Sequence, residues 1–173
     1  MTLRQILIHP DPRLKKPCEA VTTITDDLRA AAKDMLETMY DAPGVGLAGP
    51  QVGLMARVFV MDCVKDPEVA PRPMVLMNPE IIWASEARTV YEEGCLSIPE
   101  QYAEVERPAE VRVRWLGLDG DLHEEHFTGL WATCAQHEID HLDGKLFIDY
   151  LSPLKRQLIT RKMEKLKRDR ARG

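Results

Sequence analysis

The sequence predicts an α+β fold in which short, mainly antiparallel sheets pack around a central helix. Runs rich in β-branched and aromatic residues stand apart from the helical segments along the chain, which is typical of α+β folds and not of alternating βαβ units. The chain has 173 residues, of which 45% are hydrophobic and 29% charged. This length and composition indicate one globular domain that needs no disulfide bonds to stabilise its core.

An N-terminal helix is predicted over residues 26–42, where apolar residues recur at helical spacing and Thr25 can cap the first turn. A central helix is predicted over Leu130–Leu142, ending before Gly144, and a third helix begins after Ser152-Pro153. The sequence Asp119-Gly120 indicates a hairpin turn between two strands. The predicted strands are Arg57–Asp62, Met74–Asn78, Val111–Leu116 and Leu122–Phe127.

Charge is distributed unevenly along the chain. Residues 154–173 contain nine Lys or Arg and two acidic residues, a net charge of +7, although the whole chain has a net charge of -5. We expect residues 1–153 to form the body of the domain and residues 154–173 to be a basic helix of that same domain. Such a basic segment favours a polyanionic partner. No apolar run is long enough to span a membrane, and we see no export signal, so we expect a cytoplasmic protein with reduced cysteines.

The strongest chemical signal is His137-Glu138-Ile139-Asp140-His141. On a helix, residues four apart project from one face, so both imidazoles can bind one divalent metal ion, with Glu138 near enough to move protons. Asp140 is a candidate to accept the free N–H of a metal-bound imidazole, with a solvated aspartate as the alternative.

A catalytic metal site usually has a third protein ligand. Cys134 lies on the same helix face, but three ligands over seven residues would span about 10 Å, which a tetrahedral ion cannot easily bridge. Cys95, within the sequence Glu-Gly-Cys-Leu-Ser, is the better candidate. We expect His123 and His126 to be surface residues and Cys18 and Cys63 to be small buried residues.

The glycine-rich segment 44–53 lacks the Gly-Lys-Ser/Thr of a phosphate-binding loop and follows a helix, so a nucleotide site is disfavoured. Its glycines would let the backbone of an extended peptide approach closely, although a tight turn after the helix is the plainer alternative.

Together, the sequences GVGLAGPQ, EGCLS and HEIDH resemble the three motifs of the bacterial-type peptide deformylase family, in the same order. The resemblance extends to PDPRL near the start and DYLSPLKR near the end of the chain. It implies a cytoplasmic metal-dependent hydrolase that removes formyl from the N-terminal formylmethionine of nascent polypeptides and releases formate. Gly49 departs from the alanine usual in the family, from which we expect a looser loop, and Tyr102 stands where some relatives carry arginine.

The resemblance also implies roles for individual residues. Cys95, His137 and His141 become the metal ligands, and Glu138 becomes the general acid/base. Gln51 and the Leu96 backbone N–H become oxyanion donors. The implied metal is Fe²⁺, which Zn²⁺, Ni²⁺ or Co²⁺ can replace. The residues implied to contact the substrate are Val45, Gly46, Tyr91, Gly94, Leu130, Thr133 and Cys134.

The resemblance further implies that a monomer meets its substrate at the ribosome, whose RNA phosphates the basic helix would contact. Two alternatives remain at this stage. A small zinc endopeptidase would share the helix motif, but no downstream acidic residue has a familiar ligand spacing. A non-catalytic metal-binding protein would have no need of Glu138 or Gln51.

Overall fold

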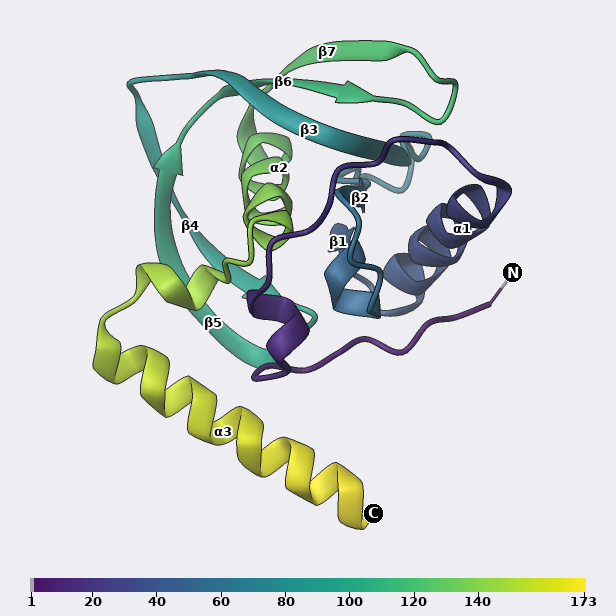
Figure 1. Cartoon of the computed structure of the whole chain (residues 1–173). Helices are drawn as coiled ribbons and strands as arrows, with labels where there is room; N and C mark the ends of the chain where they lie inside the picture. The colour runs from purple at the N-terminus through teal and green to yellow at the C-terminus, as the bar shows by residue number, and fades with distance from the viewer. Residues whose placement is uncertain (1) are drawn as a thin grey trace.

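The computed structural model describes residues 2–173 and has the predicted α+β architecture (Figure 1). Within those residues it contains three α-helices, α1 (Asp26–Asp41), α2 (Gly129–Leu142) and α3 (Pro153–Arg172). Short 3-10 turns cover Pro12–Lys15, Gly49–Val52 and Phe147–Tyr150. None of the helices is long and apolar enough to cross a membrane.

The strands form two separate antiparallel sheets. The larger sheet has the strand order β1-β2-β3-β6-β7, and β4 pairs only with β5. Figure 1 shows α2 between these two sheets, with α1 beside β1 and β2 and with α3 along one edge. The strand bounds are β1 Gly46–Ala48, β2 Val58–Met61, β3 Met74–Ala84, β4 Arg88–Cys95, β5 Ile98–Pro108, β6 Val111–Leu116 and β7 Leu122–Phe127.

The predicted helices agree with the structure to within one residue at either end. The side chain of Thr25 caps α1 by accepting a hydrogen bond from the Leu28 amide at 3.1 Å. The hairpin between β6 and β7 turns at Gly120, whose φ of 83° suits a residue without a side chain. Cys18 and Cys63 are buried, and His123 and His126 lie on the exposed surface, as expected.

The predictions for the strands were less accurate. The strand predicted to end at Asn78 continues to Ala84, because a bulge with Asn78 at a φ of 48° carries the chain past Pro79. Strands β1, β4 and β5 were not predicted. In β4 and β5 the apolar alternation is hidden, because the charged residues Glu93 and Arg107 are buried and the apolar residues Val90 and Tyr102 are exposed. Strands β3 and β5 are eleven residues long, not short.

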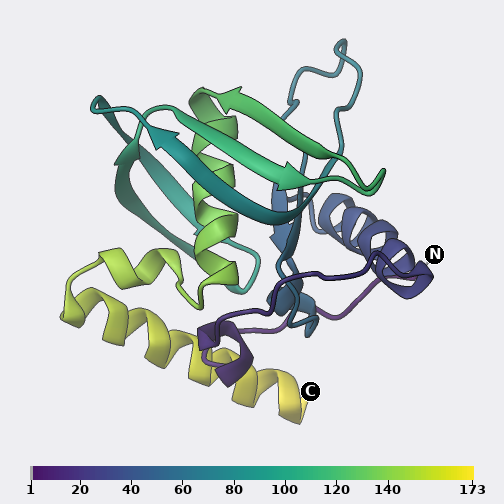
Figure 2. The ribbon, with the colours of Figure 1, turned by 45° about the horizontal axis from the view of Figure 1, so that its top comes forward.

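Three apolar clusters stabilise this arrangement. One lies between the large sheet and α2, and a second lies between α1 and strands β1 to β3. The third joins α3 to the rest of the molecule through Ile159 and Met163, which pack with Leu14, Ile98 and Phe147. Figure 2 shows α2 behind the large sheet and α3 alongside the N-terminal 3-10 turn.

Candidate metal centre

The central feature of the site is a group of three side chains from two elements. Cys95 ends β4, and His137 and His141 project from one face of α2. One potential ligand atom from each residue lies within 4.8 Å of the other two. The Cys95 Sγ atom is 3.4 Å from His141 Nε2. One thiolate and two imidazoles suit a tetrahedral divalent ion with one open position, so the residues present fit a catalytic metal.

Cys134 lies outside this group. Its thiol contacts the Val45 carbonyl oxygen at 3.7 Å. A hydrogen bond with Cys63, together with burial, raises the pKa of the Cys134 thiol well above the usual value. The geometry therefore supports Cys95 as the third metal ligand. This agrees with the argument that Cys134 and His141 lie too far apart along one helix to bind the same ion.

Glu138 is buried beside the metal group. Its Oε2 atom is 4.0 Å from His137 Nε2, and its Oε1 atom has no hydrogen-bond partner among the described residues. Burial raises the pKa of the Glu138 carboxyl to about 7. Gly46 makes room for it, because a Cβ atom there would lie 2.6 Å from Glu138 Oε2.

Gln51 connects the glycine-rich loop to the metal group. Its side-chain oxygen accepts a hydrogen bond from the Ala48 amide at 2.9 Å, which fixes the orientation of the carboxamide. Its Nε2 atom then donates to Ser97 Oγ at 3.1 Å and lies 3.5 Å from Cys95 Sγ. Gln51 therefore presents an oriented N–H donor beside the Cys95 thiol.

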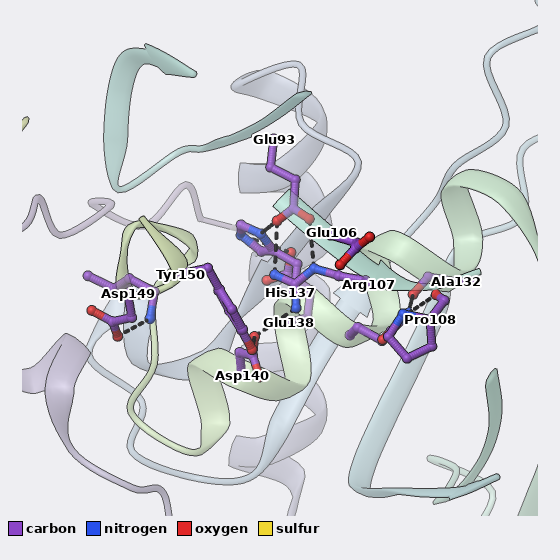
Figure 3. A network of polar contacts seen from close by, with 12 residues as sticks. Glu93, Glu106, Arg107, Pro108, Ala132, His137, Glu138, Asp140, Asp149 and Tyr150 are labelled. Carbon is purple, nitrogen blue, oxygen red and sulfur yellow. Dashed lines mark hydrogen bonds and ion pairs between the residues drawn. The ribbon is translucent and has the colours of Figure 1, made fainter. Parts of the chain in front are cut away.

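Asp140 does not contact either histidine, contrary to the expectation. Instead, Glu93 accepts the hydrogen bond from His137 Nδ1 at 2.9 Å and pairs with the buried Arg107 (Figure 3). Asp140 is one step further away, since it accepts hydrogen bonds from Arg107 at 2.9 Å and from Tyr150 at 2.7 Å. Among the described residues, His141 Nδ1 has no partner.

The Glu93–Arg107 pair is almost fully buried, with side-chain exposures of 4% and 5%. Burial by itself raises the pKa of Glu93, but hydrogen bonds from His137 and Arg107 hold it below the usual value. Glu93 therefore stays ionised and keeps the Nδ1 proton on His137, which leaves Nε2 free to bind a metal. Sequence reasoning missed both residues. One signal could have revealed Arg107. Ala103 and Val105 alternate toward the covered face of β5, and Arg107 is the next residue in that alternation, so its charge must be buried there.

The site opens into a cleft of about 470 Å³. The Leu96 residue lies on its wall beside Cys95, and Tyr102 lies at the same opening with its ring against Gly94. All seven residues expected to contact the substrate line this cleft: Val45, Gly46, Tyr91, Gly94, Leu130, Thr133 and Cys134.

The Gly49 departure does not loosen the loop. A Cβ atom at this position would lie 2.6 Å from the Leu54 carbonyl oxygen and 3.0 Å from that of Ala56. The missing methyl group thus lets neighbouring backbone close in around Gly49 and does not leave a gap.

A Cys/His/His group beside a buried glutamate and an oriented amide, in a cleft bordered by a strand, defines the class of metal-dependent hydrolases that act on amide substrates. Comparison with known proteins identifies the family. The family model for polypeptide deformylase matches residues 3–157. The chain belongs to the peptide deformylase family, whose members remove formyl groups from the N-terminal formylmethionine of nascent peptides.

Relatives match over nearly the whole chain. The chain is 58% identical to the peptide deformylase of Afipia carboxidovorans and 55% identical to that of Bradyrhizobium diazoefficiens, covering 95% of this chain and at least 96% of each relative. The crystal structure of a peptide deformylase from Legionella pneumophila superposes with a TM-score of 0.91 at 46% identity, covering 99% of both chains. That of Ehrlichia chaffeensis in complex with actinonin has a TM-score of 0.93 at 36% identity, covering 97% of this chain and 99% of that one.

Proposed function

We propose that this chain hydrolyses the formyl group of N-formylmethionyl peptides at the Cys95, His137 and His141 group. The observation that carries the proposal is the position of this group, which lies in one cleft with Glu138 and Gln51. A divalent metal bound there would supply a water of lowered pKa and polarise the formyl carbonyl. Ferrous iron is the proposed native ion, with Zn²⁺, Ni²⁺ or Co²⁺ as replacements.

The remaining steps belong to side chains of this protein. Glu138, buried beside the metal group, takes a proton from the attacking water and delivers it to the departing amine. The Gln51 amide and the Leu96 backbone N–H stabilise the charge that develops on the formyl oxygen. The products are formate and a free methionine N-terminus.

The methionine side chain is proposed to occupy the part of the cleft lined by Tyr91, Leu130, Thr133 and Cys134. The peptide backbone would lie extended between Val45-Gly46 on one side and Glu93-Gly94 on the other. Gly46 begins β1, and Glu93 and Gly94 lie in β4, so each side can add main-chain hydrogen bonds to an extended ligand.

The test is formate release by anaerobically purified protein whose metal content is measured at the same time. Formyl-Met-Ala-Ser should be hydrolysed, and an unformylated peptide with internal bonds should stay intact. Glu138→Ala should retain its metal and lose about 10²–10⁴ in kcat, the usual effect of a positioned proton carrier. Cleavage of the unformylated peptide would instead identify an endopeptidase.

We further propose that α3 brings the enzyme, as a monomer in the cytoplasm, to the ribosome surface. The exposed residues Lys155, Arg161, Lys162 and Lys165 supply positive charge for RNA phosphates. Each phosphate contact adds about 0.7–0.9 to the slope of log affinity against log salt. Charge reversal at Arg161 and Lys162 should therefore weaken co-sedimentation with ribosomes and flatten its salt dependence. Unchanged pelleting across a salt series would contradict this role, and light scattering tests the monomer.

A further inference from the structure

A second cleft, of about 630 Å³, lies on the other side of the turn that joins β4 to β5. The N-terminal segment forms one wall, the end of α1 forms another, and the C-terminal part of α3 closes the far side. In both views of the ribbon the N-terminal segment passes between α1 and α3 (Figures 1 and 2). The wall residues that matter below are Gln5, Asp41, Ala42, Leu96, Pro99, Lys167 and Arg170.

This second cleft adjoins the active-site cleft along two borders. Leu96 and Pro99 line both clefts. On the opposite border, Asp41 and Ala42 line the second cleft, and Pro43 and Gly44 follow directly along the chain to line the first. The Leu96 side chain lies against Gly44, where a Cβ atom would be 2.8 Å from its Cδ1 atom, so these two residues form the boundary between the clefts.

The two ends of the second cleft differ in charge. Arg13 and Arg4 line it, but they pair with Asp11 and Asp34. Lys167 and Arg170 are exposed on α3, and within residues 2–173 neither forms an ion pair. Unpaired positive charge therefore lies at the end of the second cleft formed by α3. The negative charge of Asp41 lies at the opposite end, nearest the boundary formed by Gly44 and Leu96.

We propose that the second cleft binds the downstream part of the nascent chain, after that chain leaves the active-site cleft past Gly44 and Leu96. The inference rests on the proposed function, because it extends the path of the same peptide substrate. An extended chain with an acidic residue near Lys167 and Arg170 is the preferred occupant. The protein would thus distinguish nascent chains by residues well beyond the methionine.

The test compares formyl-Met-Ala-Ser with nine-residue formyl peptides that begin with the same three residues. An aspartate is placed in turn at positions five to nine of otherwise uncharged peptides. At low salt, kcat/KM should rise for the long peptides and peak at one aspartate position, by about two- to fivefold, the range of an exposed ion pair. The increase should fade at high salt.

Variants then locate the effect. Lys167→Glu with Arg170→Glu should lower the ratio of kcat/KM for the aspartate nonapeptide to that for the tripeptide, and should favour a lysine at the same peptide position. Arg168→Glu with Arg172→Glu makes the same charge change on α3 outside the cleft wall and should leave the ratio as in the unmodified protein. Gln5→Trp, which fills the cleft without changing charge, should lower kcat/KM for uncharged long peptides.

Two failures can be told apart. Absence of tripeptide hydrolysis by metal-loaded protein would contradict the proposed function itself. Tripeptide hydrolysis with the same kcat/KM for every length and charge, or with equal responses from the two charge-reversed pairs, would overturn the second cleft as the path of the chain.

Discussion

Cys95 and Cys134 line the same cleft as His137 but differ in what surrounds them. Cys95 Sγ faces His141 Nε2, whereas the Cys134 thiol faces the Val45 carbonyl and is buried with a raised pKa. We therefore predict that Cys95→Ala removes both metal and activity. Cys134→Ala should keep the metal and mainly raise KM for formylmethionyl peptides. Metal stoichiometry of the two purified variants decides between them, and a metal-free Cys134→Ala protein would reverse the assignment.

Glu93 determines which nitrogen of His137 carries the proton. Its carboxylate accepts the Nδ1–H bond and is held ionised by Arg107. We predict that Glu93→Gln weakens metal binding by about 10–100-fold, the usual effect of losing such a partner. Asp140→Asn is the matched control, because Asp140 acts on His137 only through Arg107 and Glu93, and its effect should be several-fold smaller. Metal affinity is measured by competition against a chelator. Equal losses of affinity in the two variants would contradict a direct role for Glu93 and an indirect one for Asp140.

At the residue scale, the sequence was sufficient for groups that act through short motifs. The spacing of His137 and His141 on one helix and the glutamate between them needs no tertiary information. Glu93 and Arg107 could not be found this way, because their pairing depends on the register in which β4 and β5 meet. A buried charge becomes recognisable only when its partner from another strand is known.

At the scale of elements, His9 joins the N-terminal segment to α3. Its ring is buried, with Nε2 hydrogen-bonded to Thr160 Oγ1 at 2.8 Å, and its amide donates to the Ser97 carbonyl oxygen at 2.9 Å. Burial lowers the pKa of His9 to about 4 from the usual 6.5. The charged groups that face it make smaller contributions, with lowering by Lys15 and Lys167 and raising by Asp149 and Glu164.

This pKa predicts a pH-dependent stability. Between about pH 6.5 and 4 the unfolded chain binds a proton at His9 that the folded protein does not, so the free energy of unfolding falls as the pH falls. We expect His9 to account for a loss of about 2 kcal/mol over this range. His9→Gln, which can still bond to Thr160, should lose less stability than the unmodified protein between pH 7 and 4.5. Urea unfolding at both pH values tests this, and parallel losses would show that His9 is not responsible.

Comparison of the individual elements explains why the helices were predicted better than the strands. Each helix carries its own signals in the sequence, such as Thr25 before α1 and Gly144 after α2. Strand β1 has three residues, and its existence depends on pairing with β2. Strand β3 passes through a bulge that Asn78 stabilises by hydrogen bonds to the Val21 backbone, a contact 57 residues away in sequence.

At the scale of the whole molecule, the question is whether α3 folds with the rest of the chain, as we propose. Its charged face suggests a detachable targeting segment, yet Met163 is 2% exposed and packs with Leu14 and Ile98. Ile98 pairs with Cys95, so the apolar face of α3 supports the turn that carries a metal ligand. Removing residues 160–173 would thus expose this cluster, which makes charge reversal the cleaner test of ribosome binding.

We predict that Met163→Ala lowers the free energy of unfolding of the entire protein by about 2–5 kcal/mol, because it leaves a cavity in a shared apolar cluster. Leu158→Ala is the control, since this leucine lies on the same helix but is 48% exposed, and its effect should stay within about 0.5 kcal/mol. Denaturation is recorded with two probes on the same samples: tryptophan fluorescence, which reports the large sheet through Trp115, and the helical circular dichroism signal. Both probes should give one shared transition, and this transition should shift in Met163→Ala. If only the circular dichroism signal shifts, α3 unfolds independently and the proposal of one domain fails. A shared shift would mean that α3 and the rest of the protein unfold together. Binding of α3 to the ribosome would then also stabilise the turn that carries Cys95.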